Sequence, residues 1–288
     1  MSGSGLTGSS SIALSRLPQT LAKLLALGRP LVMGILNVTP DSFSDGGRFA
    51  DPERATARAR QTVDEGADIL DIGAVSTRPY GGAHPVSEEE EFARLEKVLP
   101  GLTALEIPVS IDTMNAKIAA WALDQGAAIV NDVWGLQRDP AMAGVVAERG
   151  VPVIVMHNRD AADPSIDIVA DIVGFFERSL AIAGSNGIRR EQIVLDPGIG
   201  FGKTPEQSLS VIANLSELRS FGLPLLIGAS RKRFISSIVP SEPHERLGGS
   251  IAAHLVAVAN GAAIVRVHDV AETVQALRIS AAIQQTHG

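Results

Sequence analysis

The sequence predicts a single (β/α)8 barrel of the TIM type with a short N-terminal extension, and three observations support this prediction. The chain has 288 residues, 45% of them hydrophobic, which suits one α/β barrel with a large core. Eight short apolar runs alternate with stretches that can form helices. A polar residue follows nearly every run. We therefore expect residues 31–288 to form the barrel and residues 1–30 to form a tail and a short helix.

The N-terminal extension contains two different segments. Met1–Ser11 is rich in glycine and serine, which predicts a disordered tail, and it lacks the basic start and apolar middle of a signal peptide. Leucines recur at helical spacing in Pro18–Leu27. We expect this second segment to form a helix that lies across the bottom of the barrel.

The apolar runs are short and rich in β-branched residues, as expected for buried parallel strands. They are Val32–Leu36, Ile69–Ile72, Val109–Ile111, Ala128–Val130, Val153–Met156, Ile193–Leu195, Leu225–Ile227 and Ile264–Val267. Several of the stretches between them begin with an acid and end with glycine, as helices often do. They are Glu53–Gly66, Glu88–Leu105, Ala116–Gly126, Pro140–Gly150, Ile166–Gly184, Glu206–Phe221, Glu245–Gly261 and Glu272–Gln285. An open doubly wound sheet would have fewer strands and a glycine fingerprint after the first.

The residues at the carboxyl ends of these runs predict a functional site. In a barrel all eight ends meet at one rim, where barrel enzymes place their chemistry. The polar residues expected there are Asn37, Asp71, Asp112, Asn131, Asp132, His157, Asp196, Ser230, Arg231, Lys232, Arg266 and His268. Arg266 and His268 are two residues apart, so both should lie on the same side of their strand, with Val267 toward the helices.

The rim residues fall into two groups with different chemistry. Carboxylate, amide and ammonium groups could bind a flat, amide-like heterocycle, and this group comprises Asp112, Asn131, Asp196 and Lys232. Further donors and cations could hold a phosphate or diphosphate, and this group comprises Asn37, Arg78, Arg266 and His268. Each residue also has a purely structural interpretation as a helix cap, a solvated charge or a core histidine. Their number on one rim favours a binding site.

Three loops next to the rim support this interpretation. In Ile193–Pro205, glycines at every second position after Asp196 let the backbone approach a flat ligand, although Asp196 could instead cap the next helix. Loops 37–47, which contains Phe43, and 76–85, which contains Arg78, are rich in glycine and proline. We interpret these two loops as lids that expel water from the anion-binding half.

Seven motifs of the chain resemble, in order, those of the dihydropteroate synthase family. They are Gly34–Gly47, Ser76–Pro79, Ser110–Thr113, Asn131–Asp132, Leu195–Lys203, Ser230–Lys232 and Arg266–Asp269. The resemblance covers about residues 31–278, and seven motifs in register are highly specific. It implies a reaction of folate biosynthesis, in which 4-aminobenzoate displaces diphosphate from 7,8-dihydropterin-6-ylmethyl diphosphate to give 7,8-dihydropteroate.

The resemblance also implies roles for the matching residues. The pterin would be held by Asp112, Asn131, Asp196 and Lys232, with Arg266 stacking near it. The diphosphate would be contacted by Thr77, Arg78, Arg266 and His268, with Asn37 as a ligand of Mg²⁺. The 4-aminobenzoate pocket would be lined by Thr77, Pro79, Phe201 and Ser230, with Phe43 and Asp45 closing over it. The residues with catalytic roles would be Asp112, Asp196, Lys232 and Arg266.

Loss of diphosphate would leave a cationic methylene-pterin. A buried carboxylate such as Asp112 or Asp196 would stabilise the positive charge, while Mg²⁺ and the cations stabilise the departing anion. We therefore predict a dissociative displacement without a covalent nucleophile. Two alternatives are a pterin-dependent methyltransferase, which should lack Ser230–Lys232 and the Arg78 loop, and a pterin-binding paralogue without catalysis, which should have lost an anion contact.

The chain departs from the family pattern at four places. It has Gly73–Val75 where many members have Gly-Gly-Glu, it has a longer loop at Tyr80–His84, and Trp134 and Asn158 are unexpected. None of these is a pterin contact in the assignment above. They affect the expected shape of the 4-aminobenzoate pocket and its response to sulfonamides.

Composition narrows the range of partners. A net charge of -7 and a pI near 5.4 argue against nucleic acid or an anionic membrane surface, and favour small molecules. The lack of cysteine excludes disulfides, thiolate zinc sites and a cysteine nucleophile, and fits the cytoplasm. No apolar run is long enough to span a membrane. The resemblance implies a homodimer, for which Ile251, Leu255, Val256 and Val258 could supply the interface.

Overall fold

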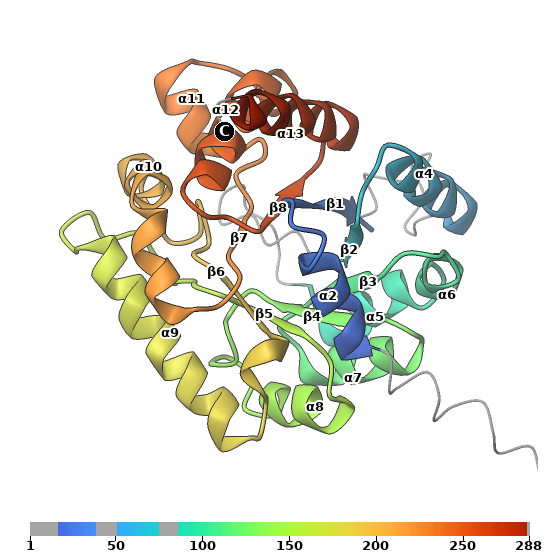
Figure 1. Ribbon diagram of the computed structural model, residues 1–288. Coiled ribbons are helices and arrows are strands. Elements are labelled where there is room, and N and C mark those ends of the chain that lie inside the picture. Colours follow the sequence, from blue (N-terminus) through green and yellow to red (C-terminus); the bar gives the residue numbers. More distant parts are fainter. Residues whose placement is uncertain (1–16, 39–50, 75–85, 287–288) are drawn as a thin grey trace, which may run out of the picture.

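The computed structural model describes residues 17–38, 51–74 and 86–286. Eight parallel strands form its inner layer (Figure 1), as the sequence predicted. They are β1 (Leu31–Asn37), β2 (Ile69–Gly73), β3 (Val109–Asp112), β4 (Ile129–Asp132), β5 (Val153–Met156), β6 (Ile193–Asp196), β7 (Leu226–Ile227) and β8 (Ile264–Val267). Hydrogen-bonded neighbours follow the order β6-β5-β4-β3-β2-β1-β8-β7. A bridge between Leu195 and Leu225 joins the two ends, so the sheet closes into a (β/α)8 barrel.

Helices surround this barrel (Figure 1). They are α2 (Leu17–Leu25), α4 (Pro52–Asp64), α5 (Glu88–Leu95), α6 (Leu99–Thr103), α7 (Ala116–Asp124), α8 (Met142–Arg149), α9 (Ile168–Ser185), α10 (Pro205–Ala213), α11 (Arg233–Ile238), α12 (Leu247–Ala259) and α13 (Val270–Gln285). Short 3₁₀ helices are η1 (Arg190–Gln192), η2 (Leu215–Phe221) and η3 (Pro243–Glu245). None of the helices within the described residues is long and apolar enough to cross a membrane.

Three predicted helices differ from the observed ones. The stretch 88–105 contains two helices, α5 and α6, because Pro100 fits only the first turn of a new helix. The stretch 206–221 changes at Asn214 from an α-helix to the 3₁₀ helix η2. The stretch 245–261 begins with the end of η3 and continues as α12, while the preceding α11 was not predicted at all.

The N-terminal helix α2 closes the bottom of the barrel, as predicted. Leu21 of α2 is buried in a cluster with Leu31, Ile69 and Ile264, the first residues of three strands. Leu24 and Leu25 pack against the same cluster. Figure 1 shows α2 in front of the barrel opening. The opposite end, where the strands terminate in polar residues, is therefore the end that can hold a site.

Strand alternation directs side chains as expected in β8. Val265 and Val267 face outward into a cluster with Val270 and Leu277 of α13. Arg266 lies between them in sequence and bonds to acids of strands β2 and β3. The predicted division, with Arg266 inward and Val267 toward the helices, is confirmed.

Candidate active site

Four polar residues from four strands form one network at the carboxyl end of the barrel. Arg266 Nε donates to Asp71 Oδ2 at 2.6 Å, and Arg266 Nη2 donates to Asp112 Oδ2 at 2.7 Å. Asn131 Nδ2 donates to the same Asp71 oxygen at 3.1 Å. Arg266 is 195 and 154 residues from these acids in sequence, so the closure of the barrel brings them together. The predicted convergence of Asp112, Asn131 and Arg266 is thus observed.

The acids of this network have unused hydrogen-bonding capacity. Asp71 and Asp112 are buried, and no donor in the described part of the chain reaches their Oδ1 atoms. Burial raises the pKa of Asp112 to about 7; Arg266 opposes this rise, and Asp71 adds to it. Buried acceptors without donors are unfavourable unless a ligand or water satisfies them. The pair is therefore suited to a ligand that offers N–H groups.

Arg266 is the counter-charge that holds these acids. Burial alone would lower the pKa of Arg266, but Asp71 and Asp112 raise it well above its ordinary value, so the guanidinium stays charged. Arg266 thus bonds to two carboxylates in this structure. A substrate that donates to Asp112 Oδ2 would share that oxygen with Arg266 or take its place.

Asp196 at the end of β6 lies beside the same network. Its Oδ1 accepts the backbone N–H of Gly198 at 2.7 Å. Burial raises the pKa of Asp196 to about 6, while the charges of Arg266 and Lys232 lower it, which places both cations within electrostatic range of this carboxylate. The second oxygen of Asp196 is not used by Gly198.

An apolar wall lies next to Asp196. Phe201 packs with Val133, Met156 and Trp134. Lys232 Nζ lies 4.0 Å from the centre of the Phe201 ring, a cation–π distance. A flat ring bound between the acids and this wall would meet an aromatic face on one side and donors at its edge. Phe201 and Lys232, predicted for different substrates, are thus in contact.

Ser230 and His268 form a pair at the ends of β7 and β8. Ser230 Oγ accepts the backbone N–H of His268 at 3.2 Å and lies 2.9 Å from His268 Nδ1. Burial, followed by the charges of Arg231 and Arg266, lowers the pKa of His268 to about 3, so the imidazole is neutral. His268 therefore provides a neutral donor or acceptor, not a cation, toward an anionic ligand.

The turn between Ser230 and Lys232 has an unusual backbone conformation. Arg231 has a φ of +58°, which side chains other than glycine rarely adopt. Its N–H donates to Ser250 Oγ of α12 at 2.9 Å, and its side chain pairs with Asp269. These contacts stabilise the strained turn, and the turn sets the orientation of Ser230 and Lys232 on either side of Arg231.

Two other predicted rim residues have structural roles. Asp132 accepts the backbone N–H groups of Trp134 at 2.9 Å and Leu136 at 2.7 Å, and burial raises its pKa to about 6. His157 bonds to the buried Lys203 behind the rim. Asp132 therefore stabilises the turn that follows β4 and is not the N-cap of α8, which is Ala141, and His157 does not belong to the network of Arg266.

Several predicted residues lie outside the described part of the chain. They are Phe43, Asp45, Thr77, Arg78 and Pro79, together with the two loops that contain them and the departures at Val75 and Tyr80–His84. Asn37 is described and ends β1 at the rim. The described residues contain no group of three or more His, Cys, Asp or Glu that could hold a metal. A single amide oxygen such as that of Asn37 fits Mg²⁺, which commonly keeps waters and binds substrate phosphates.

A cavity of about 600 Å³ lies beside the mouth rather than over the acids. Its lining comprises Trp134, Gln137, Arg138, Asn158, Arg159, Asp160, Ala161, Ala162, Asp163, Phe175 and Arg178. Arg266, Asp71 and Asp112 do not line this cavity. Two of the departures from the family pattern, Trp134 and Asn158, do line it.

Sequence reasoning gave no role to two residues that the structure makes central. Asp71 was expected at the rim, but its pairing with Arg266 and Asn131 was not foreseen. An acid inside the apolar run Ile69–Ile72 was the available signal. Lys203 ends the motif Leu195–Lys203 in a glycine-rich loop, where a charged side chain is expected to be solvated, yet only 1% of it is exposed.

The fold is that of (β/α)8-barrel enzymes, and the buried acids at its mouth have oxygens to which a ligand with N–H groups could donate. Residues 33–268 match the pterin binding enzyme family. A dihydropteroate synthase of Bacillus subtilis is 45% identical over 243 residues, covering 84% of each chain, and one of Clostridium beijerinckii is 43% identical over 88% of this chain and 93% of its own.

Solved structures agree with these relatives. A Clostridium difficile dihydropteroate synthase, crystallised in the presence of pteroic acid, matches with a TM-score of 0.85 and 47% identity over 88% of this chain and 97% of its own. The Xanthomonas albilineans enzyme with 4-aminobenzoic acid matches with a TM-score of 0.85 and 43% identity over 90% and 94%. The chain belongs to the pterin binding enzyme family. It is an enzyme, a transferase of the dihydropteroate synthase type.

Proposed function

We propose that this enzyme condenses 7,8-dihydropterin-6-ylmethyl diphosphate with 4-aminobenzoate to give 7,8-dihydropteroate and diphosphate. The observation that carries the proposal is the pair Asp71 and Asp112, buried and with oxygens that lack donors among the described residues. Structures of similar proteins support it: one from Xanthomonas albilineans is a complex with 7,8-dihydropteroate, and one from Yersinia pestis is a complex with a sulfonamide drug.

The proposed contacts to the pterin ring follow from hydrogen-bond complementarity. A pterin carries an amino group and ring N–H groups, which are donors suited to the carboxylates of Asp112 and Asp196 and to the oxygen of Asn131. Its carbonyl oxygen accepts from the ammonium of Lys232. The guanidinium of Arg266, now on Asp112, is a planar donor of the same type as the pterin edge. Pterin takes its place on Asp112, and Arg266 moves to stack near the ring.

The contacts to the diphosphate are proposed from the types of residue at the rim. Arg266 and His268 contact the diphosphate, together with Thr77 and Arg78. Asn37 supplies an oxygen ligand for Mg²⁺, which when bound neutralises charge on the leaving group. Because His268 is neutral, it contributes a hydrogen bond and not a full charge.

The order of bond changes is proposed to be dissociative. The bond between the pterin methylene carbon and the diphosphate oxygen breaks first, and the electron pair leaves with the diphosphate. Asp112 and Asp196 stabilise the resulting cation through their negative charges. The amine of 4-aminobenzoate then forms a carbon–nitrogen bond to the methylene carbon, and the resulting ammonium loses a proton to water. Phe201 and Ser230, with Thr77 and Pro79, line the pocket for this second substrate, and Phe43 and Asp45 close over it.

Measurements of diphosphate release test the proposed function and the proposed order of bond changes separately. In steady state, release is expected only when 4-aminobenzoate is present, whereas a methyltransferase or a pure pterin binder would release none. In a single-turnover stopped-flow experiment, cleavage should precede reaction of the amine; diphosphate appearing only with product would contradict the dissociative order. Asp196→Asn should abolish both signals, and the surface variant Asp124→Asn should retain them.

A homodimer is also proposed, on the basis of exposed apolar side chains on two adjacent helices. Val256 of α12 is 49% exposed, and Ile279 and Ile283 of α13 are 58% and 57% exposed. Of the predicted interface residues, Leu255 packs partly into the core, and Val256 provides an exposed surface. Light scattering should give twice the chain mass, and Val256→Glu should shift it toward the monomer. The cytoplasmic location expected from the sequence stays a prediction.

A further inference from the structure

Lys203 is a lysine in the interior of the protein, only 1% exposed. Its ammonium nitrogen lies 2.7 Å from His157 Nδ1 and donates to the carbonyl oxygens of Gly198 at 2.9 Å and Phe201 at 3.1 Å. Each of these three atoms can accept one N–H of the ammonium group. A buried lysine in such a setting is costly to desolvate, so its contacts have to compensate.

The two carbonyls belong to the glycine loop that follows Asp196. Gly198 has a φ of +67° and Gly202 a φ of +54°, and a Cβ on either would lie within 2.4 Å of residues His157 or Arg159. The loop is therefore pressed against the backbone after β5, and glycine is required at both positions. Gly198 N–H in turn bonds to Asp196 Oδ1.

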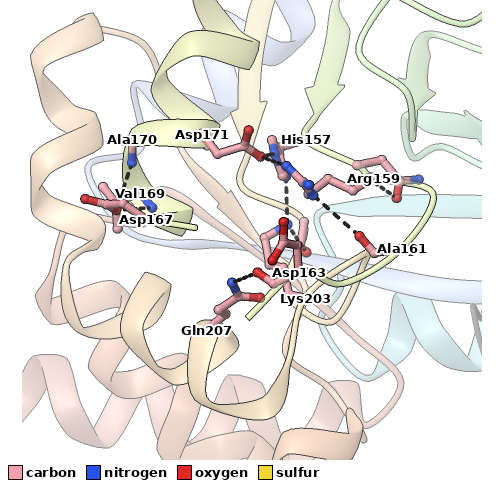
Figure 2. A network of polar contacts seen from close by, with 12 residues as sticks. His157, Arg159, Ala161, Asp163, Asp167, Val169, Ala170, Asp171, Lys203 and Gln207 are labelled. Carbon is pink, nitrogen blue, oxygen red and sulfur yellow. Dashed lines mark hydrogen bonds and ion pairs between the residues drawn. The ribbon is translucent and has the colours of Figure 1, made fainter. Parts of the chain in front are cut away.

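A second layer of contacts holds the partner of Lys203. Figure 2 shows His157 between Lys203 and Asp171 of α9, with Nε2 lying 3.0 Å from Asp171 Oδ2. Arg159 Nη1 donates to the same oxygen at 2.8 Å. Burial, then the charge of Lys203, lowers the pKa of His157 to about 3. The neutral ring accepts from Lys203 through Nδ1 and donates to Asp171 through Nε2, so its tautomer is fixed.

We propose that Lys203 is a positioning residue for the transfer reaction. By binding the carbonyl oxygens of Gly198 and Phe201, it fixes the position of the Asp196 carboxylate and of the Phe201 ring, whose face contacts the Lys232 ammonium. Lys203 would touch neither substrate. Lys203 acts on both halves of the ring-binding site. One carbonyl belongs to Gly198, whose N–H binds Asp196, and the other belongs to Phe201, whose ring is part of the apolar wall. This inference rests on the proposed function.

The positioning depends on the proton of Lys203. Burial lowers the pKa of Lys203 to about 7. The groups that face it are Asp196 and Asp171, which raise this pKa, Lys232 and Arg159, which lower it, and the neutral His157. A neutral amine has only two N–H donors, so loss of the proton breaks one of the three contacts. The loop should then loosen as the pH rises above neutrality.

The direct test is Lys203→Met, which keeps the length of the side chain and removes its donors. The KM for 4-aminobenzoate and the Kd for 6-hydroxymethylpterin should each rise at least about tenfold, the effect of losing one charge-assisted hydrogen bond. Lys117→Met, at an exposed lysine paired with Glu88, is the matched control and should leave both unchanged. Values for Lys203→Met equal to wild type would overturn the proposal.

A second variant remains informative if Lys203→Met fails to fold. Asp171 is partly exposed, and its charge raises the pKa of Lys203. In Asp171→Asn the alkaline limb of kcat/KM for the pterin diphosphate should therefore move to lower pH, since this quantity reports ionisations of the free enzyme. Ionisation of the substrate is the same in both proteins and cancels. A purely structural role would lower the melting temperature and leave the limb in place, which would contradict the proposal.

The outcomes separate this inference from the proposed function. If wild type releases no diphosphate with 4-aminobenzoate, the function is wrong, and calorimetry with 6-hydroxymethylpterin still compares Lys203→Met with wild type. If wild type is active while both variants behave like it, Lys203 has no positioning role although the function stands.

Discussion

Replacing Asp112 with asparagine should stabilise the ligand-free protein at pH 8 while abolishing pterin binding. Two buried acids, Asp71 and Asp112, share the single guanidinium of Arg266, so one negative charge is in excess. Asparagine keeps the shape of the side chain and an oxygen for Arg266, and it removes that charge. The variant would gain stability at the expense of the acceptor that a pterin needs.

The magnitude follows from the pKa of Asp112, which burial raises from 3.8 to about 7. At about 1.36 kcal/mol per pH unit, keeping this group ionised costs the folded state about 4 kcal/mol above pH 7. This pKa already includes the attraction to Arg266, so removing the charge should gain about 4 kcal/mol at pH 8. A gain of about 4 kcal/mol corresponds to a rise in Tm of roughly 8–15 °C.

The raised pKa of Asp112 also determines the sign of the pH dependence of stability. Because the pKa of Asp112 is higher in the folded protein than in the unfolded chain, its protonation stabilises the fold. That contribution is complete below about pH 4 and disappears as the pH rises through about 7. The Tm difference between Asp112→Asn and wild type should therefore be large at pH 8 and close to zero or slightly negative at pH 4.

Differential scanning calorimetry from pH 4 to pH 8 measures this, with titration of 6-hydroxymethylpterin as the binding assay. Asp124→Asn is the control, because Asp124 pairs with Arg149 at the surface and such pairs contribute at most about 1 kcal/mol. A lower Tm of Asp112→Asn at pH 8, or a difference that does not vary with pH, would refute the reasoning.

Three further predictions concern the rim. Burial raises the pKa of Asp196 to about 6, so the affinity for 6-hydroxymethylpterin should fall as the pH drops through 6; a constant Kd by calorimetry between pH 5 and 8 would contradict this. Gly202→Ala places a Cβ 2.4 Å from the nearest side-chain carbon, and denaturant titrations should show a loss of more than about 2 kcal/mol in the free energy of unfolding. The control is Gly222→Ala, where the backbone is also left-handed but the Cβ would lie in open space, and it should cost only about 1 kcal/mol. Ser250→Ala removes the acceptor of the Arg231 N–H and should raise the KM for 4-aminobenzoate several-fold in steady-state kinetics, with an unchanged KM counting against the role of the strained turn.

Much of the barrel could be predicted from the sequence because strand periodicity and strand ends are local features. The apolar runs located all eight strands, and closure of the barrel then brought Asp112, Asn131 and Arg266 together without further information. The bottom helix was also predictable, since its leucine spacing matches one buried face.

The remaining features depend on contacts between distant segments. β2 and β8 pair with opposite edges of β1, and their two registers decide that Arg266 bonds to Asp71 as well as Asp112, which no local pattern encodes. Lys203 stands in a glycine-rich loop where a charged residue is expected to be solvated, yet the fold buries it. Helix boundaries failed for a related reason: hydrophobic spacing continued through Pro100, where the helix has to restart.

The short helix α2 bears on the chemistry at the far end of the barrel. Its leucines, with the interior layer that includes Met33, Ile154 and Val194, exclude water from the floor beneath the acids. Asp71 and Asp112 are buried above this apolar layer, which adds to the low polarity that raises the pKa of Asp112. Residues at the extreme start of the fold thereby help to set the proton affinity of groups they never touch.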